Sequence, residues 1–325
     1  MEIYQKQYLD FLDLAKGIGI ILVIMGHTVF PVHQVISLMH MPLFFFLSGL
    51  TLRVYPDFEN FFLKKTDRIL IPYVFFSIVS FVVARIVGYK GNIFNDPIWF
   101  LSSLFGAIIL CEVVLKKAGN KWGVVITGLL IVYSYFSFKT IHPLFPYDTE
   151  FDRILRASVF VFAGYYFRDI IFNIKQHHWL DKDWLGAVMY TFLYAVFCYL
   201  SIFVMGADGN FLEGGICKYS IILFYITSIS GILMIVYWSK WIKRISPVNW
   251  LGKHSLVIMC VHYPFLQWWN PFMSSLDYYV NGDLLHKGLF ALLSYVLAFA
   301  FSIPFVFLAK KLIPRLTGYE PLLSK

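Results

Sequence analysis

Residues Leu12 to Thr28 read LDLAKGIGIILVIMGHT, and this stretch decides the class of fold. Ten mostly aliphatic or glycine residues, Gly17 to Gly26, stand between Lys16 and His27 without the alternation of a β-strand. A bilayer core of about 30 Å needs roughly 17 to 25 apolar residues per helix, so the run predicts a transmembrane helix. Lys16 and His27 are costly to bury in lipid and therefore need an explanation.

The whole chain is as apolar as this stretch. Its 325 residues are 59% hydrophobic and 14% charged, and the mean hydropathy is +0.69, beyond the average for a soluble domain. No small-x-small cleavage site follows the first apolar run, so we expect no cleaved leader. The net charge of +8 has no soluble basic domain to carry it, which argues against a nucleic-acid ligand. We therefore predict an all-α, polytopic membrane protein with one transmembrane domain over residues 1–325 and no appended soluble domain.

Basic residues test the predicted number of spans. With a cytoplasmic N-terminus, 20 of the 27 Lys and Arg residues fall on inside segments and 7 fall outside, as the positive-inside rule requires. An even number of spans and cytoplasmic N and C termini follow. We predict about ten transmembrane helices, over 12–31, 34–53, 69–89, 98–115, 122–138, 154–171, 184–205, 217–238, 254–270 and 286–310.

The four cysteines do not suggest a metal site or a redox pair. They lie far apart in apolar runs, with no CxxC spacing, at Cys111, Cys198, Cys217 and Cys260. We expect buried free thiols.

Lys16 and His27 share one face of the first helix. Eleven steps of about 100° end about 20° past three full turns, and the two residues lie about 16 Å apart along the axis. Lys16 is then expected at the cytoplasmic boundary, within one turn of Asp13, and His27 in the outer half of the membrane. The alternative for His27 is an ordinary helix–helix hydrogen bond.

The second predicted helix carries His40 in SLMHMPLFFFLSG, near the depth estimated for His27. Pro42 has no N–H to donate to the carbonyl of Leu38, so a kink and a free acceptor are expected beside His40. Ser48 and Gly49 permit close helix packing or serve a function, and the sequence favours neither.

A third histidine, His262, lies on the predicted helix HSLVIMCVHYPF, about 12 Å beyond His254. A shared polar cavity explains His27, His40 and His262 together, because each is costly in lipid unless it faces polar surroundings. Zinc is the weaker alternative, since no carboxylate or thiolate at that depth clearly joins them, although Cys260 is near in sequence.

A basic cluster, Lys64, Lys65 and Arg68, leads into the third predicted helix and is followed by Ile-Pro-Tyr. Such a cluster most often sets topology or contacts lipid headgroups. Together with Lys16 on the same side of the membrane, it is also suited to the phosphates of a cytosolic cofactor.

Taken in order along the chain, these residues resemble the membrane acyltransferase 3 family, and within it the fucose 4-O-acetylase-like branch. The resemblance rests on D-x-x-K-G with His27 beyond it, HMPLFFFLSG, KKTDRILIPY, DPIWFL and WLGKHSLVIMCVH. It implies a multi-pass protein of the bacterial cytoplasmic (inner) membrane. Its activity would be acyl transfer, usually of acetyl from acetyl-CoA, to hydroxyls of cell-surface polysaccharides or lipid-linked sugar precursors.

The resemblance also implies roles for particular residues. The basic residue and histidine of the family's first helix match Lys16 and His27, although many members have Arg at the first position and Lys16 offers only a point charge. His27 is expected to be the general base, with His40 or His262 orienting it or stabilising the oxyanion. An alternative is a relay in which His27 is itself acetylated.

Further expectations concern the two substrates. Lys16, Lys64, Lys65 and Arg68 would hold the phosphates of acetyl-CoA, and the acceptor would contact Trp99, Tyr263 and Ser48. No metal is expected. The main rival function is a secondary transporter or lipid-linked sugar flippase, against which stands the absence of a two-fold repeat of hydropathy; a membrane sensor without catalysis is a third. The sequence names neither the sugar nor the hydroxyl.

Overall fold

The computed structural model describes residues 2–28, 33–88, 98–137, 149–172, 182–206, 221–274 and 284–324. All regular structure in these ranges is helical, as predicted. Cys217 lies outside them. The chain forms two compact units, unit 1 being Met1–Gly19, Gln34–Pro56 and Gly106–Lys253, and unit 2 being Ile20–His33, Asp57–Phe105 and His254–Lys325.

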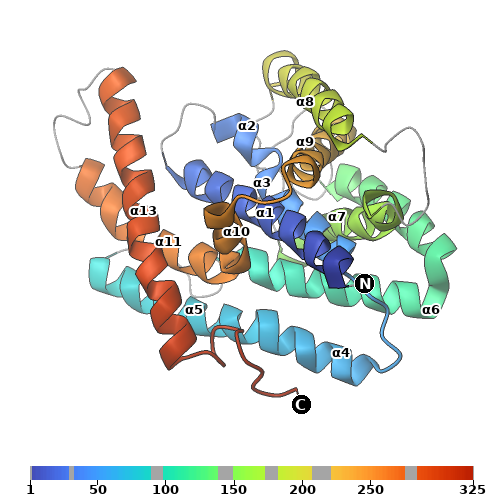
Figure 1. The fold of residues 1–325 in the computed structure, drawn as a ribbon, viewed down its shortest axis with the longest axis horizontal. Coiled ribbons are helices and arrows are strands. Elements are labelled where there is room, and N and C mark those ends of the chain that lie inside the picture. The colour runs from blue at the N-terminus through green and yellow to red at the C-terminus, as the bar shows by residue number, and fades with distance from the viewer. Residues whose placement is uncertain are drawn as a thin grey trace. The chain divides into compact units, whose positions relative to one another are not determined.

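Each unit is built from helices that come from distant parts of the chain. Unit 1 holds most of α1 (Glu2–His27), α3 (His40–Leu50), most of α6 (Trp99–Phe136), α7 (Glu150–Ile171), α8 (Asp183–Tyr199) with a π-helical turn Leu200–Val204, α9 (Ile221–Ile242) and α10 (Ser246–Lys253). Unit 2 holds the end of α1, α4 (Phe58–Lys65), a π-helical turn Thr66–Leu70, α5 (Ile71–Val87), α11 (Ser255–Ser274) and α13 (Leu284–Leu312). Within the units, α8 lies beside α9 and α11 beside α13 (Figure 1).

Six helical segments in the described ranges are long and apolar enough to cross a membrane, which supports a multi-pass membrane protein. They are His33–Leu50, Phe58–Ile86, Trp99–Phe136, Asp183–Val204, Ile221–Ile242 and Gly288–Leu312. The larger count of ten, and the side on which the termini lie, stay predictions.

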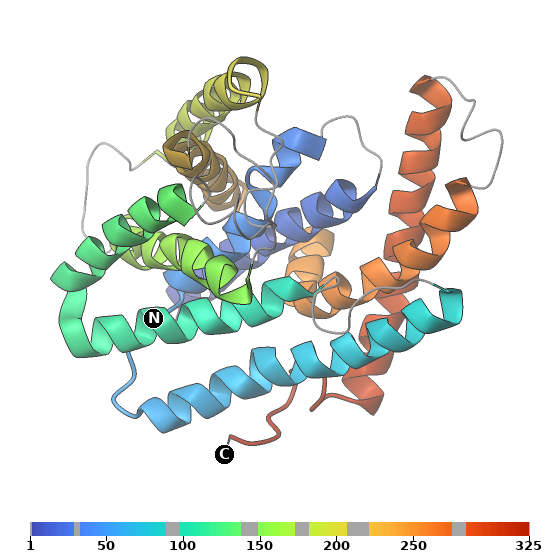
Figure 2. The same ribbon diagram turned by 180° about the vertical axis from the view of Figure 1, so that it is seen from behind.

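Of the ten predicted spans, 254–270 fails to qualify because its apolar helix, Ser255–Leu266, is short. Two features explain the other three. The 38 residues of α6 cover two predicted spans, and at 1.5 Å per residue they extend about 57 Å, too far for one crossing. Gly119, at φ 77°, interrupts the helix and produces the bend seen in Figure 2. The other feature is charge, since α1 carries Asp10, Asp13 and Lys16, and α7 begins with Glu150, Asp152, Arg153 and Arg156.

The second predicted helix is broken rather than kinked. It consists of α2 (His33–Ser37) and α3, and a new helix starts at His40. Pro42 thus lies in the first turn of α3, where its missing N–H is not needed, so the expected proline kink is wrong. The expected acceptor is there, however, because the Leu38 carbonyl receives a hydrogen bond from Ser228 Oγ of α9 at 2.5 Å.

Glycines allow α3 and α7 to meet backbone to backbone. A Cβ at Gly49 would lie 2.0 Å from the carbonyl oxygen of Val161, and a Cβ at Gly164 would lie 2.0 Å from that of Phe46. Real Cβ atoms essentially never come this close, so the contact requires both glycines. This confirms close packing at Gly49.

In unit 2, the segment that follows α13 is fixed by one buried carboxylate. Asp67, in the π-helical turn and 2% exposed, accepts hydrogen bonds from the backbone N–H groups of Leu322, Leu323 and Ser324 at 3.0, 2.8 and 2.7 Å. The Ser324 hydroxyl donates a fourth at 2.6 Å. Two carboxylate oxygens offer about four acceptor positions, so these bonds saturate Asp67.

Gly49→Ala tests the α3–α7 contact. The added methyl meets fixed backbone, so we expect a loss of about 1 to 3 kcal/mol in the free energy of unfolding, measured as a lower thermal midpoint in detergent. Gly128→Ala is the matched control, because that helical glycine of α6 has open space around it and alanine is there favoured by roughly 0.5 to 1 kcal/mol. Equal midpoints for the two variants would contradict the packing argument.

Asp67→Asn tests the anchoring of the last segment. The amide replaces an acceptor oxygen with a donor that faces donors, so we expect amide hydrogen exchange at Leu322, Leu323 and Ser324 to speed up roughly tenfold or more. Asp169→Asn removes an equal charge from a side chain that is 44% exposed and serves as the control. Unchanged exchange in Asp67→Asn would refute the anchoring role.

Candidate active site

Two of the three predicted histidines come together in unit 2. His27 ends α1 and His262 lies on α11, and their ring centroids are 5.2 Å apart with an interplanar angle of 69°. The ring of Tyr263 also meets His27 edge-on, at 5.4 Å and 85°. His262 is buried at 2% exposure, whereas His27 and Tyr263 are half-buried. We call these three residues the His27 cluster.

All three histidines of the prediction are held in the same way by their own helix or turn. Nδ1 lies 2.8 Å from the Val23 carbonyl oxygen in His27, 3.1 Å from that of Ile258 in His262, and 2.9 Å from that of Ile36 in His40. A carbonyl oxygen can only accept a hydrogen bond, so Nδ1 must carry the proton. In each neutral ring the lone pair therefore lies on Nε2.

The local structure points the basic nitrogen away from its own backbone. In His262 this Nε2 atom is buried and has no hydrogen-bond partner among the described residues. A buried acceptor of this kind costs free energy until a donor reaches it. The His27 cluster thus presents a neutral imidazole acceptor in an apolar environment, beside a second imidazole and a phenol.

His40 and Ser48 belong to α3 of unit 1. His40 is 5% exposed, and the hydroxyl of Ser48 donates to the carbonyl of Phe44 at 2.8 Å. That bond to the preceding turn is the ordinary one for a helical serine in an apolar environment. Ser48 consequently has a structural use that does not involve a substrate.

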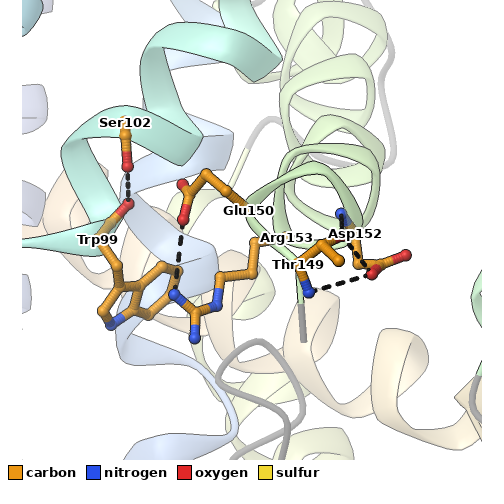
Figure 3. A network of polar contacts seen from close by, with 6 residues as sticks. All are labelled: Trp99, Ser102, Thr149, Glu150, Asp152 and Arg153. Atoms are coloured by element: carbon orange, nitrogen blue, oxygen red, sulfur yellow. Dashed lines mark hydrogen bonds and ion pairs between the residues drawn. The ribbon is translucent and has the colours of Figure 1, made fainter. Parts of the chain in front are cut away.

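Trp99 opens α6 in unit 2 and is 7% exposed. Its ring meets that of Phe100 edge-on at 6.5 Å, and its carbonyl accepts a hydrogen bond from Ser102 Oγ at 2.8 Å (Figure 3). A sugar can stack only on an open aromatic face. The half-buried Tyr263 meets this requirement better than the buried Trp99.

The predicted basic cluster lies where α4 passes into α5. Lys64 and Lys65 form the last turn of α4 and are half-buried, and Arg68 in the π-helical turn is exposed. The segment anchored on Asp67 passes close by, since a Cβ at Gly318 would lie 3.2 Å from the Arg68 carbonyl oxygen. The cluster therefore borders a folded backbone segment that sequence periodicity did not indicate.

A second link holds the same segment. Tyr319 Oη lies 2.7 Å from Nδ1 of His254, the residue just before α11. Burial raises the pKa of Tyr319 to about 12, so the phenol keeps its proton at neutral pH.

In unit 1, Lys16 lies within one turn of Asp13, as predicted. Its Nζ atom lies 3.6 Å from Oδ1 of Asp13, one turn earlier on α1. A second lysine, Lys253 at the end of α10, lies 3.9 Å from Oδ2 of the same carboxylate. Sequence reasoning assigned Lys253 no role, although WLGKHSL was singled out as a motif.

A second polar group that the sequence did not reveal lies at the start of α7. Thr149 and Asp152 form a capping box (Figure 3). Asp152 also accepts a hydrogen bond from Tyr133 at 2.5 Å. Burial opposes ionisation of Asp152, but bonds from Thr149 and Tyr133 keep its pKa below the ordinary value. Arg156, one turn further, is fully buried. The T-x-x-D pattern is a signal that could have indicated the cap, whereas the burial of Arg156 depends on its neighbours in the fold.

The described residues contain no group of three or more His, Cys, Asp or Glu side chains placed to hold a metal ion. Cys111, Cys198 and Cys260 are buried and free.

Comparison with known proteins adds the last observation. The sequence profile of the acyltransferase 3 family, described as an acyltransferase domain, matches residues 9–310. Neither the curated proteins nor the solved structures contain a match to the chain. Because the profile covers nearly the whole chain, this protein belongs to the membrane acyltransferase 3 family.

Proposed function

We propose that this membrane acyltransferase moves an acetyl group from cytosolic acetyl-CoA to a hydroxyl of a cell-surface polysaccharide or of its lipid-linked sugar precursor. The family supports acyl transfer. The observation that carries the chemistry is the His27 cluster. Nδ1 of His27 donates to the carbonyl of Val23, so Nε2 of His27 is the basic atom. A sugar hydroxyl is a poor nucleophile at neutral pH, and a neutral imidazole supplies the base it lacks.

In the proposed reaction Nε2 of His27 removes the hydroxyl proton as the sugar oxygen attacks the thioester carbonyl carbon. A C–O bond forms and the carbonyl π electrons move to the oxygen. The tetrahedral intermediate then collapses, the C–S bond breaks, and the sulfur leaves with its electron pair. His27 returns the proton to the sulfur, so CoA departs as a thiol and the base is regenerated.

The histidine tautomers refine the assignment of the oxyanion donor. A neutral His262 or His40 with its proton on Nδ1 offers only a lone pair at Nε2, and a lone pair repels a developing oxyanion. The ring of Tyr263 lies edge-on to His27 and carries a hydroxyl that can donate a hydrogen bond, so we assign the oxyanion role to that hydroxyl. His262 is left to orient the base by the packing of its ring, and both His262 and His40 are left to accept hydrogen bonds from substrate hydroxyls.

A relay uses the same atom differently. Nε2 of His27 would attack the thioester to give an acetylimidazole and free CoA thiol, and the sugar hydroxyl would then take the acetyl group. Either route needs an Nε2 lone pair, so the tautomer supports both.

The remaining assignments complete the proposal. Lys16, Lys64, Lys65 and Arg68 would contact the CoA phosphates, Tyr263 and Trp99 the sugar, and Ser48 the acceptor. The protein would lie in the bacterial cytoplasmic (inner) membrane with ten spans and both termini inside, as a member of the fucose 4-O-acetylase-like branch. The alternative of a sugar transporter or flippase draws no support from the family match.

His27→Ala tests the base. With purified protein, labelled acetyl-CoA and a lipid-linked sugar or polysaccharide, we expect acetyl transfer to fall by about 10² to 10⁴, the usual contribution of a general base. His33→Ala, a histidine of α2 outside the His27 cluster, should retain the wild-type rate. An unchanged rate in His27→Ala would remove the base from the mechanism, and wild-type protein that moves a sugar across vesicles without consuming acetyl-CoA would favour the transporter.

Tyr263→Phe separates the phenol from its ring. The variant keeps the aromatic face and loses the donor, so we expect kcat to fall roughly 10²-fold, with KM for the acceptor nearly unchanged. A raised acceptor KM with kcat intact would show that the Tyr263 hydroxyl binds the sugar and does not stabilise the oxyanion.

A further inference from the structure

Helix α10 lies directly on α1 in unit 1, with nothing between the two backbones. A Cβ at Gly17 would lie 2.0 Å from the Val248 carbonyl oxygen, and a Cβ at Gly252 would lie 1.8 Å from that of Asp13. No side chain fits at either position. The two glycines therefore set the point at which the helices cross.

One asparagine fixes α10 along α1. Asn249, 3% exposed, donates through Nδ2 to the Asp10 carbonyl at 2.6 Å and accepts the N–H of Ile245 at Oδ1, at 2.8 Å. Both groups of the amide are used, so sliding or rotating α10 would break buried hydrogen bonds. The last residue of α10, Lys253, is thus delivered to a defined place beside α1.

That place is the carboxylate already paired with Lys16. Lys16 Nζ lies 3.6 Å from Oδ1 of Asp13 and Lys253 Nζ lies 3.9 Å from Oδ2. Both separations exceed the usual hydrogen-bond range of about 2.7 to 3.2 Å, so neither ammonium is tightly bound. Asp13 alone balances one of the two positive charges, and the carboxylate of Asp10, one turn earlier on α1, also acts electrostatically on Asp13.

Exposure shows which way this group faces. The Asp13 side chain is 11% exposed, that of Lys16 36% and that of Lys253 56%. The carboxylate lies beneath and the two ammonium groups reach outward. An anion that approaches the group meets the cations before it meets the carboxylate.

We propose that Lys253 joins Lys16 in binding the phosphate groups of the acyl-CoA donor, with Asp13 beneath them holding the two ammonium groups side by side. The inference rests on the proposed function and adds to it a residue that had no role. Phosphate oxygens accept several charge-assisted hydrogen bonds at once. Two lysines on one phosphate provide the two-point contact that a single lysine, unlike an arginine fork, lacks.

A purely structural role explains less of the arrangement. A salt bridge to Asp13 needs one lysine, and bringing a second beside it adds like-charge repulsion. The second lysine is nonetheless placed there by two features: the close crossing of α1 and α10 at Gly17 and Gly252, and the hydrogen bond from Asn249 to α1. A bound dianion removes the repulsion and uses both cations.

Calorimetry of CoA binding to purified protein in phosphatidylcholine nanodiscs tests the inference. We expect Lys253→Gln and Lys16→Gln each to weaken CoA binding roughly tenfold, the loss expected for one hydrogen bond to a charged group. Lys253→Arg keeps the charge and should stay within about threefold of wild type. The matched control is Lys117→Gln, which removes the same charge from an exposed lysine of unit 1 and should change nothing.

The outcomes separate the two levels of the argument. Wild-type protein that fails to bind CoA would overturn the proposed function itself. Wild-type protein that binds CoA, with Lys253→Gln equal to Lys117→Gln, would overturn only the role of Lys253. In nanodiscs containing phosphatidylglycerol, a Lys253→Gln variant that loses anionic lipid but keeps CoA would identify a headgroup contact and likewise overturn it. Unaltered thermal midpoints and the Lys253→Arg variant guard against misfolding.

Discussion

A bilayer core contains no water to hydrogen-bond a polar side chain, and this constraint shapes most of the polar contacts in the protein. Helical hydroxyls answer it by donating to the carbonyl one turn earlier; Ser48, Ser134, Ser230 and Ser302 all do so at 2.6 to 2.8 Å. The histidines follow the same rule through Nδ1. A serine hydroxyl has only one proton to donate, and this bond uses it. A histidine ring has a second nitrogen that remains available. Satisfying the first one determines the chemistry of the other.

The acceptor nitrogen of the proposed base therefore follows from the hydrogen bond that its other nitrogen makes to the backbone. Because Nδ1 of His27 donates to Val23, its Nε2 is the acceptor whatever substrate arrives. The same geometry makes His262 an acceptor, and we therefore propose the phenol of Tyr263, rather than His262, as the oxyanion donor. No residue dedicated to fixing the tautomer is needed, in contrast to sites where a carboxylate has that task.

The sequence predicted those parts of the structure that depend on neighbours along one helix. Hydropathy gave the membrane class, and the three-turn spacing placed Lys16 and His27 on one continuous helix, α1. The pairing of Lys16 with Asp13 and the close approach at Gly49 followed from local spacing and residue size. Pro42 was read correctly as a missing donor and wrongly as a kink, because periodicity does not show that the chain leaves the helix at residues 38 and 39.

What the sequence could not give are contacts between residues far apart in the chain. Lys253 meets Asp13 across 240 positions, and the glycines and asparagine responsible look like ordinary helix residues until the two helices are seen together. Arg156 is fully buried, and the spacing of residues along one helix does not show this. The clustering of His27 with His262 could be proposed from their depth, whereas the edge-on geometry with Tyr263 could not.

The segment after α13 is held through its backbone and not through its side chains. The Asp67 carboxylate accepts hydrogen bonds from three consecutive backbone N–H groups, while the side chains of Leu322 and Leu323 are about half exposed. Every amino acid except proline carries that N–H group, so the segment can change almost all of its residues and still dock. The residue that determines the position of the segment is Asp67 in the π-helical turn, and not a side chain of the segment itself. Related chains could therefore share this feature while their aligned residues show no similarity there, and the place to look for it is the carboxylate.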